Sequence, residues 1–427
     1  MCRREQRQLR RFATYGFPMD VTADQQAAQP VAAWSAVFAV SLCAATLVAT
    51  EWMPVSLLTP IAGGLRLTEG QAGQAISVSG LFAILTSLFI SASTRGIDRR
   101  SVLLWLTGIT LVSGIVVAFA PSYPVFMAGR ALVGMAVGGF WSMSAATMIR
   151  IVPARDVPRA LAVLNGGNAL ATTIAAPLGS FLGQYIGWRG AFFCVVPIAA
   201  LTLLWQFFTL PAMPSQERAG AAAAFKVLRR PGVPYGMLAA ALFFLGQFAL
   251  FTYSRPFFET VTLVDVTTIS ALLLVMGVAG LIGTSLIGLV VHRRLHASLV
   301  VMPFAMAVIA VALTVYGSSL GATAALMFLW GLIGTAAPVG WWTWLSTALP
   351  DDAEAGGGLM VAVIQLAITA GAAGGGVLFD FSGYRATFLF SAVILALSSS
   401  VILIGALRRR AKADAQCAAC VPASPAL

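Results

Sequence analysis

Charged residues are scarce in this 427-residue chain. Only 10% of its residues are Asp, Glu, Lys or Arg and 59% are hydrophobic, whereas soluble domains carry roughly 25% charged residues. So little charge excludes an ordinary soluble domain, and most of the chain must be solvated by lipid. The composition predicts an all-α integral membrane protein.

Lysine is almost absent, because Lys226 and Lys412 are the only two copies. The phosphate-binding loop of ATP-hydrolysing proteins places a lysine directly after a glycine. Lys226 follows Phe225 and Lys412 follows Ala411, so neither lysine fits that pattern. We therefore expect any transport by this chain to draw on an ion gradient or on the gradient of the substrate itself.

Cysteine and histidine are also rare, with five Cys and two His in the chain. Cys417 and Cys420 form a single C-x-x-C pair in a tail, and His292 and His296 flank two arginines in a basic loop. A closed zinc site needs about four ligands, so we expect no metal site and no cofactor. The apolar stretches hold no nucleophile and base pair, so the chain is not predicted to be an enzyme.

Apolar stretches of about 20 residues recur along the chain, which is the length that a helix needs to cross ~30 Å of hydrocarbon. Short polar gaps separate these stretches. The sequence therefore predicts twelve transmembrane helices. They cover approximately Ser35 to Leu58, Ala72 to Ser93, Val102 to Ala120, Val125 to Met148, Ala160 to Ile186, Ala191 to Leu210, Gly236 to Tyr253, Thr267 to Val291, Ser298 to Gly317, Ala322 to Leu345, Gly358 to Phe379 and Thr387 to Leu407.

Positive residues are distributed unevenly between the gaps. Most of the 26 Lys and Arg residues lie in the tails and in alternate gaps, which form one side of the membrane when the N-terminus is placed in the cytoplasm. Because cytoplasmic segments are enriched in Lys and Arg, both termini are predicted to be cytoplasmic, and this requires an even number of helices. The net charge of +11 then needs no nucleic-acid partner.

A polar connection rich in Pro and Ala divides the predicted helices six and six. The division predicts two six-helix bundles joined by a cytoplasmic linker. The expected units are a cytoplasmic tail at 1–33, a first bundle at 34–210, the linker at 211–233, a second bundle at 234–407 and a C-terminal cytoplasmic tail at 408–427.

Two short motifs repeat between the predicted bundles. Gly187-Trp188-Arg189 after the fifth helix is echoed by Gly383-Tyr384-Arg385 after the eleventh, and Asp98-Arg99-Arg100 is echoed by His292-Arg293-Arg294. Such repeats indicate parallel halves related by an axis along the membrane normal. A substrate would then be held between the halves near the midplane.

Two ionisable residues lie well inside the predicted spans, Glu51 in the first and Arg130 in the fourth. A charge at the helix centre costs about 2.5–3.5 kcal/mol on insertion scales, so each residue marks a functional site by default. Counting from the external helix ends places Glu51 roughly 14 Å and Arg130 roughly 10 Å deep. We predict a proton-coupling pair that is joined when Glu51 is ionised and separated when Glu51 takes a proton. The alternative is a permanent structural ion pair.

Polar and aromatic side chains in the spans are candidates for substrate contact. Tryptophan faces stack on planar heterocycles and amides hydrogen-bond their edges, although tryptophan also marks membrane interfaces. These residues would suit a flat heterocycle. The candidates are Trp141, Asn165, Asn168, Gln247, Trp341, Trp342, Trp344 and Gln365.

The predicted fifth helix contains Pro177 and Gly179 in an A-P-L-G string. Small residues allow close helix packing and a proline frees a backbone carbonyl. Packing alone accounts for this string. Alternatively, it forms a flexing interface between halves that rock during alternating access, and Pro177 and Gly179 then take part in gating.

The chain resembles the major facilitator superfamily over nearly all of the predicted helices. The resemblance is carried by Asp98-Arg99-Arg100, by the G-R-A-L-x-G string at 129–134, by A-P-L-G in the fifth helix and by the G-W-R string after it. The fifth-helix string is typical of twelve-helix drug:proton antiporters. The resemblance implies the major facilitator fold and a gating role for Asp98, Arg99 and Arg100.

A narrower resemblance is to bacterial purine ribonucleoside efflux pumps. It is carried by P-V-S-L-L-T-P at 54–60, G-G-F-W at 138–141, G-Q-F-A at 246–249 and V-A-V-I-Q-L at 361–366. It implies export of inosine, guanosine and their analogues in exchange for protons across a bacterial inner membrane, with Glu51 and Arg130 at the matching positions. We expect a monomer. Export of sugars or drugs, uptake, and a sensor that transports nothing are the alternatives.

Overall fold

The computed structural model describes residues 33–94, 96–214, 227–230, 232–349 and 353–419, and these residues form helices without any β-strand. Ten helical stretches in this part of the chain are long and apolar enough to cross a membrane. Two of them, Arg159–Thr209 and Gly356–Gly405, have 51 and 50 residues, so each is long enough to cross twice.

Glycines break both of the long stretches. Gly187 has φ 72° and ψ 166°, and Gly383 has φ 74° and ψ −178°, a region of backbone space that is open essentially to glycine alone. Division at these two glycines gives the twelve spans that the sequence predicts. The repeated G-W-R and G-Y-R motifs are therefore the same turn in each half, and Arg189 and Arg385 lie over the rings of Trp188 and Tyr384.

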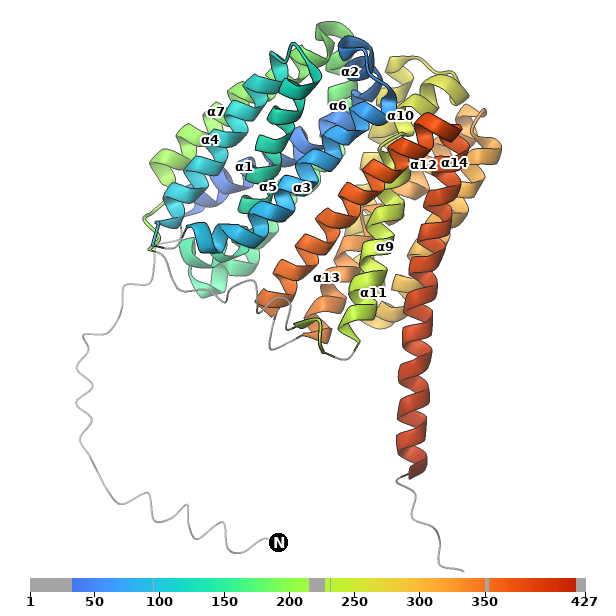
Figure 1. The fold of residues 1–427 in the computed structure, drawn as a ribbon. Coiled ribbons are helices and arrows are strands. Elements are labelled where there is room, and N and C mark those ends of the chain that lie inside the picture. Colours follow the sequence, from blue (N-terminus) through green and yellow to red (C-terminus); the bar gives the residue numbers. More distant parts are fainter. Residues whose placement is uncertain (1–32, 95, 215–226, 231, 350–352, 420–427) are drawn as a thin grey trace, which may run out of the picture.

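The first half of the chain forms one group of helices, in which α1 packs against α6 and α7, and α5 packs against α3 and α4. Figure 1 shows this group in blue to green. Its elements are α1 (Trp34–Ser56), α2 (Leu58–Leu65), α3 (Glu69–Ser93), α4 (Arg99–Ala118), α5 (Tyr123–Ile151), the short 3-10 helix Ala154–Asp156, α6 (Val157–Phe193) and α7 (Val195–Thr209).

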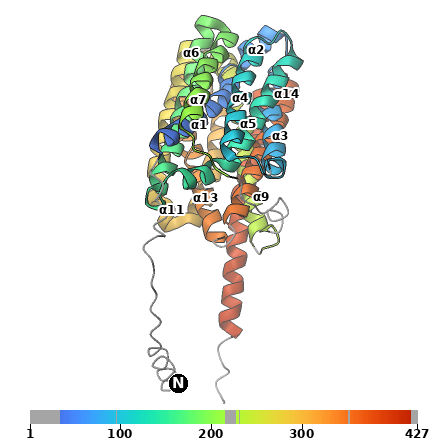
Figure 2. The ribbon, with the colours of Figure 1, turned by 90° about the vertical axis from the view of Figure 1, so that its left-hand side faces the viewer.

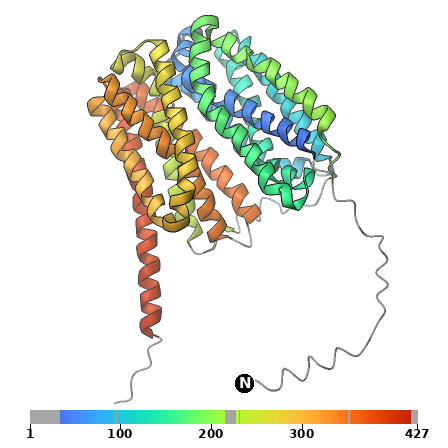
Figure 3. The ribbon, with the colours of Figure 1, turned by 180° about the vertical axis from the view of Figure 1, so that it is seen from behind.

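The second half forms a matching group, in which α9 packs against α14, and α11 packs against α12, α13 and α14. Figure 3 shows the two groups side by side from behind. The elements of this second group are α9 (Val233–Phe251), α10 (Ser254–Phe257), a π-helical turn at Phe258–Thr262, α11 (Val266–Tyr316), α12 (Leu320–Gly334), α13 (Ala337–Ala348) and α14 (Ala353–Ala419).

The two groups meet through α3 against α14 and through α6 against α11. Hydrogen bonds between the groups include Ser77 Oγ to the Thr369 carbonyl at 3.1 Å and Thr173 Oγ1 to the Gly277 carbonyl at 3.4 Å. The groups converge on the side where α2 and α10 lie and diverge toward the side of the described chain ends (Figure 1).

The outer surface of the helices is apolar. Trp105 is 74% exposed, Phe208 is 75% exposed and Phe381 is 85% exposed. Exposed aromatic rings of this size would be costly in water, but they are matched to a hydrocarbon solvent. The fold is therefore that of an all-α integral membrane protein.

Three helix boundaries differ from the predicted ones. The first helix was expected to end at Leu58, yet after a break at Leu57 the chain continues as α2 to Leu65, and the tenth predicted helix is divided after Gly334 into α12 and α13. The last helix was expected to end at Leu407, yet α14 continues to Ala419 and extends beyond the other helices (Figure 2). Good helix formers such as Ala, Arg, Lys and Gln make up most of that extension.

The proposed domain boundaries depend partly on segments that the structure does not describe. The tail at 1–33 lies outside the described residues except for Ala33, and the linker at 211–233 is described only at 211–214, 227–230 and 232–233. The C-terminal tail at 408–427 is described as helix as far as Ala419.

Candidate functional site

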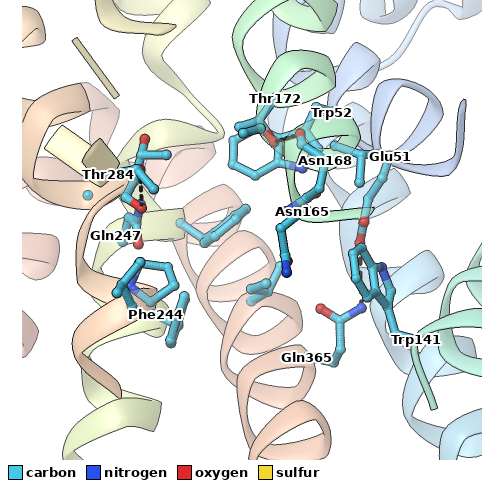
Figure 4. A pocket seen from close by; sticks show the side chains of 18 of the residues that line it. Glu51, Trp52, Trp141, Asn165, Asn168, Thr172, Phe244, Gln247, Thr284 and Gln365 are labelled. Atoms are coloured by element: carbon cyan, nitrogen blue, oxygen red, sulfur yellow. Dashed lines mark hydrogen bonds between the residues drawn. The ribbon is translucent and has the colours of Figure 1, made fainter. Parts of the chain in front are cut away.

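A cavity of about 370 Å³ lies between the two groups of helices. Residues of α1, α5 and α6 line it from the first half, and residues of α9, α11 and α13 line it from the second, together with Gln365 of α14. Figure 4 shows Trp52, Asn165 and Asn168 facing Gln247, Thr284 and Phe244 across this space. The cavity is therefore shared between the halves.

Helical periodicity explains which side chains reach the cavity. Val48, Glu51, Trp52 and Val55 line it from α1, at the i, i+3, i+4 and i+7 spacing of a single helix face. The same spacing recurs in α6 with Asn165, Asn168, Ala169 and Thr172, and in α9 with Phe244, Gln247 and Phe248. Each of these helices thus presents one mixed polar and aromatic stripe to the cavity.

Glu51 is the one ionisable residue among the described cavity-lining residues. Its side chain is partly buried. The Gln365 side-chain amide donates to Glu51 Oε1 at 3.5 Å, so the contact of Glu51 comes from the other half of the molecule. The predicted proton-coupling carboxylate is thus placed where a substrate would also lie.

Arg130 is fully buried and binds helix backbone. Nη1 donates to the Thr50 carbonyl at 2.8 Å, Nη2 to the Glu51 carbonyl at 3.4 Å, and Nε to the Ala75 carbonyl at 3.2 Å. In an α-helix the Thr50 carbonyl would accept from the N–H of the residue at position 54, but that residue is Pro54 and has no N–H. Arg130 therefore satisfies a carbonyl that proline leaves without its helical partner.

The described contacts of Arg130 do not include the Glu51 carboxylate. In this conformation the guanidinium holds α1 and α3 by their backbones, while the Glu51 carboxylate lines the cavity and contacts Gln365. The coupling role of the two residues stays a prediction.

Six of the eight candidates for substrate contact line the cavity: Trp141, Asn165, Asn168, Gln247, Trp342 and Gln365. Trp341 and Trp344 do not line it. Trp341 is 1% exposed and Trp344 is 4% exposed, and both line a small separate pocket of about 30 Å³ formed by residues of the second half. Binding of a substrate by these residues stays a prediction.

Sequence reasoning missed several cavity residues. Trp52 lies next to Glu51 and packs against Phe248 and Phe251 of the other half, with ring centroids 5.6 and 5.2 Å apart. Its adjacency to an intramembrane acid was the available signal. Thr172 follows Asn168 by one helical turn, which was the second signal. Nothing in their spacing indicated two further threonines of the cavity, Thr284 and Thr335.

The predicted gating residues fall into two groups. Asp98 caps the N-terminus of α4 by accepting from the Arg100 N–H at 2.8 Å, and it also accepts from the Met213 N–H at 3.0 Å. The Arg100 side chain donates to the Phe207 carbonyl at 2.6 Å, and the Arg99 N–H donates to the Met213 carbonyl at 3.0 Å. In this conformation these hydrogen bonds join the turn to residues of its own half.

Pro177 and Gly179 lie inside α6. A Cβ atom added at Gly179 would crowd Ser56 Oγ and Met53 of α1, so this glycine allows α1 and α6 to approach closely. The close packing is therefore within one half, while α6 contacts α11 of the other half near Thr173. The gating role of both groups of residues stays a prediction.

Comparison with known proteins decides the family. The sequence model of the Major Facilitator Superfamily matches residues 40–372. The chain belongs to this superfamily. It is thus a multi-pass membrane transporter and not an enzyme, as the major facilitator resemblance implied.

Curated relatives of this major facilitator protein are bacterial. The Transcription regulatory protein OpdE of Pseudomonas aeruginosa is 56% identical over 390 residues, which cover 90% of this chain and 95% of the relative. The Purine ribonucleoside efflux pump NepI of Shigella sonnei is 42% identical over 369 residues, covering 86% of this chain and 93% of the relative.

Solved structures of similar fold are also transporters. A bacterial homologue of the human lysosomal transporter Spinster, in an inward-facing and unoccupied conformation, has a TM-score of 0.71 at 15% identity and covers 87% of this chain and 96% of its own. A D-xylose-proton symporter has a TM-score of 0.70 at 16% identity, with 87% and 97% covered. At these identities the likeness concerns the fold.

Proposed function

We propose that this major facilitator protein exports purine ribonucleosides in exchange for protons, by alternating access, across a bacterial inner membrane. Both termini are cytoplasmic in this proposal, the working unit is a monomer, and the cavity of the described conformation is reached from the cytoplasm. The observation that carries the proposal is a shared cavity in which one carboxylate lies among amides and aromatic rings. The 42% identity to the NepI pump supports the substrate class.

The lining suits a neutral, flat and hydroxylated substrate. Trp52, Trp141 and Trp342 offer faces on which a base can stack, and four amide side chains offer donors and acceptors for base edges and ribose hydroxyls. The volume of about 370 Å³ falls in the range of roughly 300–1,000 Å³ that is usual for small-molecule sites. Gln247 Oε1 is buried without a hydrogen-bond partner among the described residues, so a substrate donor would complete its hydrogen bonding.

The Gln365 to Glu51 contact supplies a route for coupling. A substrate that hydrogen-bonds Gln365 competes with Glu51 for the same amide. Loss of that bond changes the environment of Glu51, and a change in its protonation alters how strongly the amide is held. Substrate and proton then use one site in alternation, which is the requirement for exchange.

Two observations favour other functions. A lone carboxylate in an aromatic cavity also suits a cationic drug, because rings and carboxylate both attract positive charge. The 56% identity to OpdE raises a regulatory function. Since the described chain consists of membrane helices around a small-molecule cavity, an effect on transcription would follow from the molecule that the protein moves or senses.

Counterflow in proteoliposomes separates these functions. Vesicles loaded with unlabelled inosine are given external labelled inosine, with and without an imposed pH gradient, and with a lipophilic cation or a sugar as competitor. The proposal predicts rapid labelled uptake that inosine and guanosine suppress. Suppression by the cation or sugar alone would point to drug or sugar export, and absence of flux under both conditions would point to a sensor.

A further inference from the structure

Arg255 belongs to the second half of the chain but binds the first half. It lies in α10 and is 3% exposed. Nη1 donates to the backbone carbonyl of Ser56 in α1 and to Ser180 Oγ in α6, the latter at 3.4 Å, while Nε pairs with Glu259 Oε1 at 2.8 Å. One guanidinium therefore joins two helices of the first half to the second half.

Proline explains why the Ser56 carbonyl is available. Its helical partner would be the N–H at position 60, but Pro60 has none. At Thr50 and Pro54, inside α1, Arg130 of the first half supplies the missing donor; Ser56 is the last residue of α1, where helix carbonyls in any case lack a helical partner. At Ser56 the donor comes from the opposite half, so a local backbone requirement of α1 is met only while the halves are together.

Asp380 makes the corresponding contact from α14. Its carboxylate accepts from the Thr68 hydroxyl at 2.6 Å and from the Gly70 N–H at 2.9 Å, at the N-terminus of α3 in the first half. A carboxylate is favoured there by the helix dipole and by the unpaired N–H groups of the first turn. A Cβ at Gly70 would overlap the Asp380 carboxylate, so glycine permits the contact.

Both contacts lie on the side where the halves converge, opposite the described chain ends (Figure 1). Tyr253 of the second half is buried on the same side, and a Cβ at Gly73 of α3 would overlap its hydroxyl. Two charged side chains of one half thus hold backbone groups of the other where the molecule is closed. Charged groups exchange such bonds for water readily once the halves separate, which suits a reversible contact.

We propose that Arg255 and Asp380 form the gate that closes the cavity on the side opposite the described chain ends, and that both contacts break when the cavity opens to that side. The gate acts on the alternation of access and is independent of which substrate is carried. It therefore goes beyond the proposed function and holds for any substrate of this carrier.

Spin-label distances across the gate test this proposal. Labels are placed at Tyr185→Cys in α6 and Leu263→Cys beside the π-helical turn, which are 68% and 78% exposed, in a full-length chain whose five native cysteines are serine. Arg255→Ala combined with Asp380→Asn is expected to raise the ratio of long to short distances by about tenfold, because charge-assisted hydrogen bonds are lost. Each single variant is expected to give a smaller shift.

The chain offers matched controls. Arg189 donates to the Ala120 carbonyl at 2.8 Å within the first half, and Asp265 caps α11 within the second half by accepting from the Thr268 N–H at 3.1 Å. Hydrogen bonds from Thr268 hold the pKa of Asp265 below its usual value, so its carboxylate is also charged. Arg189→Ala and Asp265→Asn should leave the distance distribution unchanged, since neither residue joins the halves.

An unchanged distribution in the folded double variant would overturn the proposal. Folding is checked by a single symmetric peak in gel filtration and by retained helical circular dichroism. If Arg255→Ala prevents folding, the Asp380→Asn variant is used alone. A longer distance between the two spin labels in this variant supports the gate, and a distance distribution equal to that of Asp265→Asn contradicts it. No step of this test requires a substrate or a pH gradient, so its outcome does not depend on nucleoside export.

Discussion

At the scale of single residues, the chemistry of the cavity depends on Glu51. It is the one ionisable group among the described lining residues, and its side-chain contact is an amide of the other half. A partly buried acid whose side-chain contact is a neutral amide is a group whose proton can be gained and lost with conformation. Arg130, the other charge inside the spans, instead serves the backbone of α1 and α3.

Glu51→Gln is expected to abolish accumulation of inosine driven by a pH gradient, to the level of protein-free vesicles. The glutamine keeps the shape and hydrogen-bonding capacity of the site but cannot release a proton, so counterflow of labelled inosine should persist. Accumulation and counterflow are measured in the same proteoliposomes. Asp265→Asn removes an acid outside the cavity and should alter neither rate. Normal accumulation by Glu51→Gln would show that another group carries the proton.

At the scale of secondary-structure elements, prolines in α1 create the positions that arginines occupy. Pro54 removes the donor for the Thr50 carbonyl, and Arg130 replaces it. This gives the costly buried arginine of α5 a structural role. It also makes the stability contributions of Pro54 and Arg130 dependent on each other.

A double-mutant cycle measures that dependence. Arg130→Ala is expected to lower the free energy of unfolding by about 3 kcal/mol, since several buried carbonyls lose their donor. In a Pro54→Ala background the loss should shrink by about 1 kcal/mol, because the helix then supplies an N–H to Thr50. Unfolding in detergent with denaturant gives these values. Pro60→Ala is the control, since Arg255 and not Arg130 holds the Ser56 carbonyl; equal coupling for both prolines would refute the explanation.

The turns between paired helices depend on glycine. Gly383→Ala is expected to lower the free energy of unfolding by about 1–3 kcal/mol, because alanine is strained at φ 74° and ψ −178°. Gly405→Ala in the same helix should be neutral or stabilising, since its position is helical and a Cβ there meets no atom within 4 Å. Thermal unfolding followed by circular dichroism compares the two variants. Equal stabilities would mean that the turn at Gly383 relaxes without cost.

The elements were largely predictable from the sequence because the hydrocarbon thickness imposes one length on every span. The positions of Gly187 and Gly383 were visible as a repeat, although their backbone conformation was not. The breaks at Leu57 and after Gly334 escaped prediction, since hydropathy does not register a local change of helix direction. The extension of α14 to Ala419 was also not predicted. Hydropathy marks where an apolar span ends, but polar residues beyond the membrane can remain helical.

The candidate site was predictable only at residue types that are rare inside membrane-spanning helices. Glu51 and Arg130 were found because charges are rare in spans, and the amides were found for the same reason. Trp341 and Trp344 were assigned to the site by residue type, but their burial inside the second half depends on which face of α13 meets α9, and one sequence does not fix that rotation. Arg255 was missed because it lies in the gap between the seventh and eighth predicted helices, outside the spans in which charges are rare.

At the scale of the whole molecule, two groups of helices share one cavity and are held together on a single side. The contacts of Arg255 and Asp380 lie opposite the described chain ends, and the turn at Asp98 is bonded within its own half. This is the arrangement expected of a carrier whose cavity is open toward its termini. The charge distribution predicts that side to be the cytoplasm, from which an exporter takes its substrate.

Proton movement evoked by a nucleoside gradient tests the central claim of exchange most directly. Proteoliposomes are loaded with inosine and an internal pH-sensitive dye and are diluted into inosine-free medium at equal pH. The account predicts that outward flow of inosine acidifies the interior, at a rate that falls as the inosine gradient is reduced. Outward flow of inosine with a constant or rising internal pH would contradict the account.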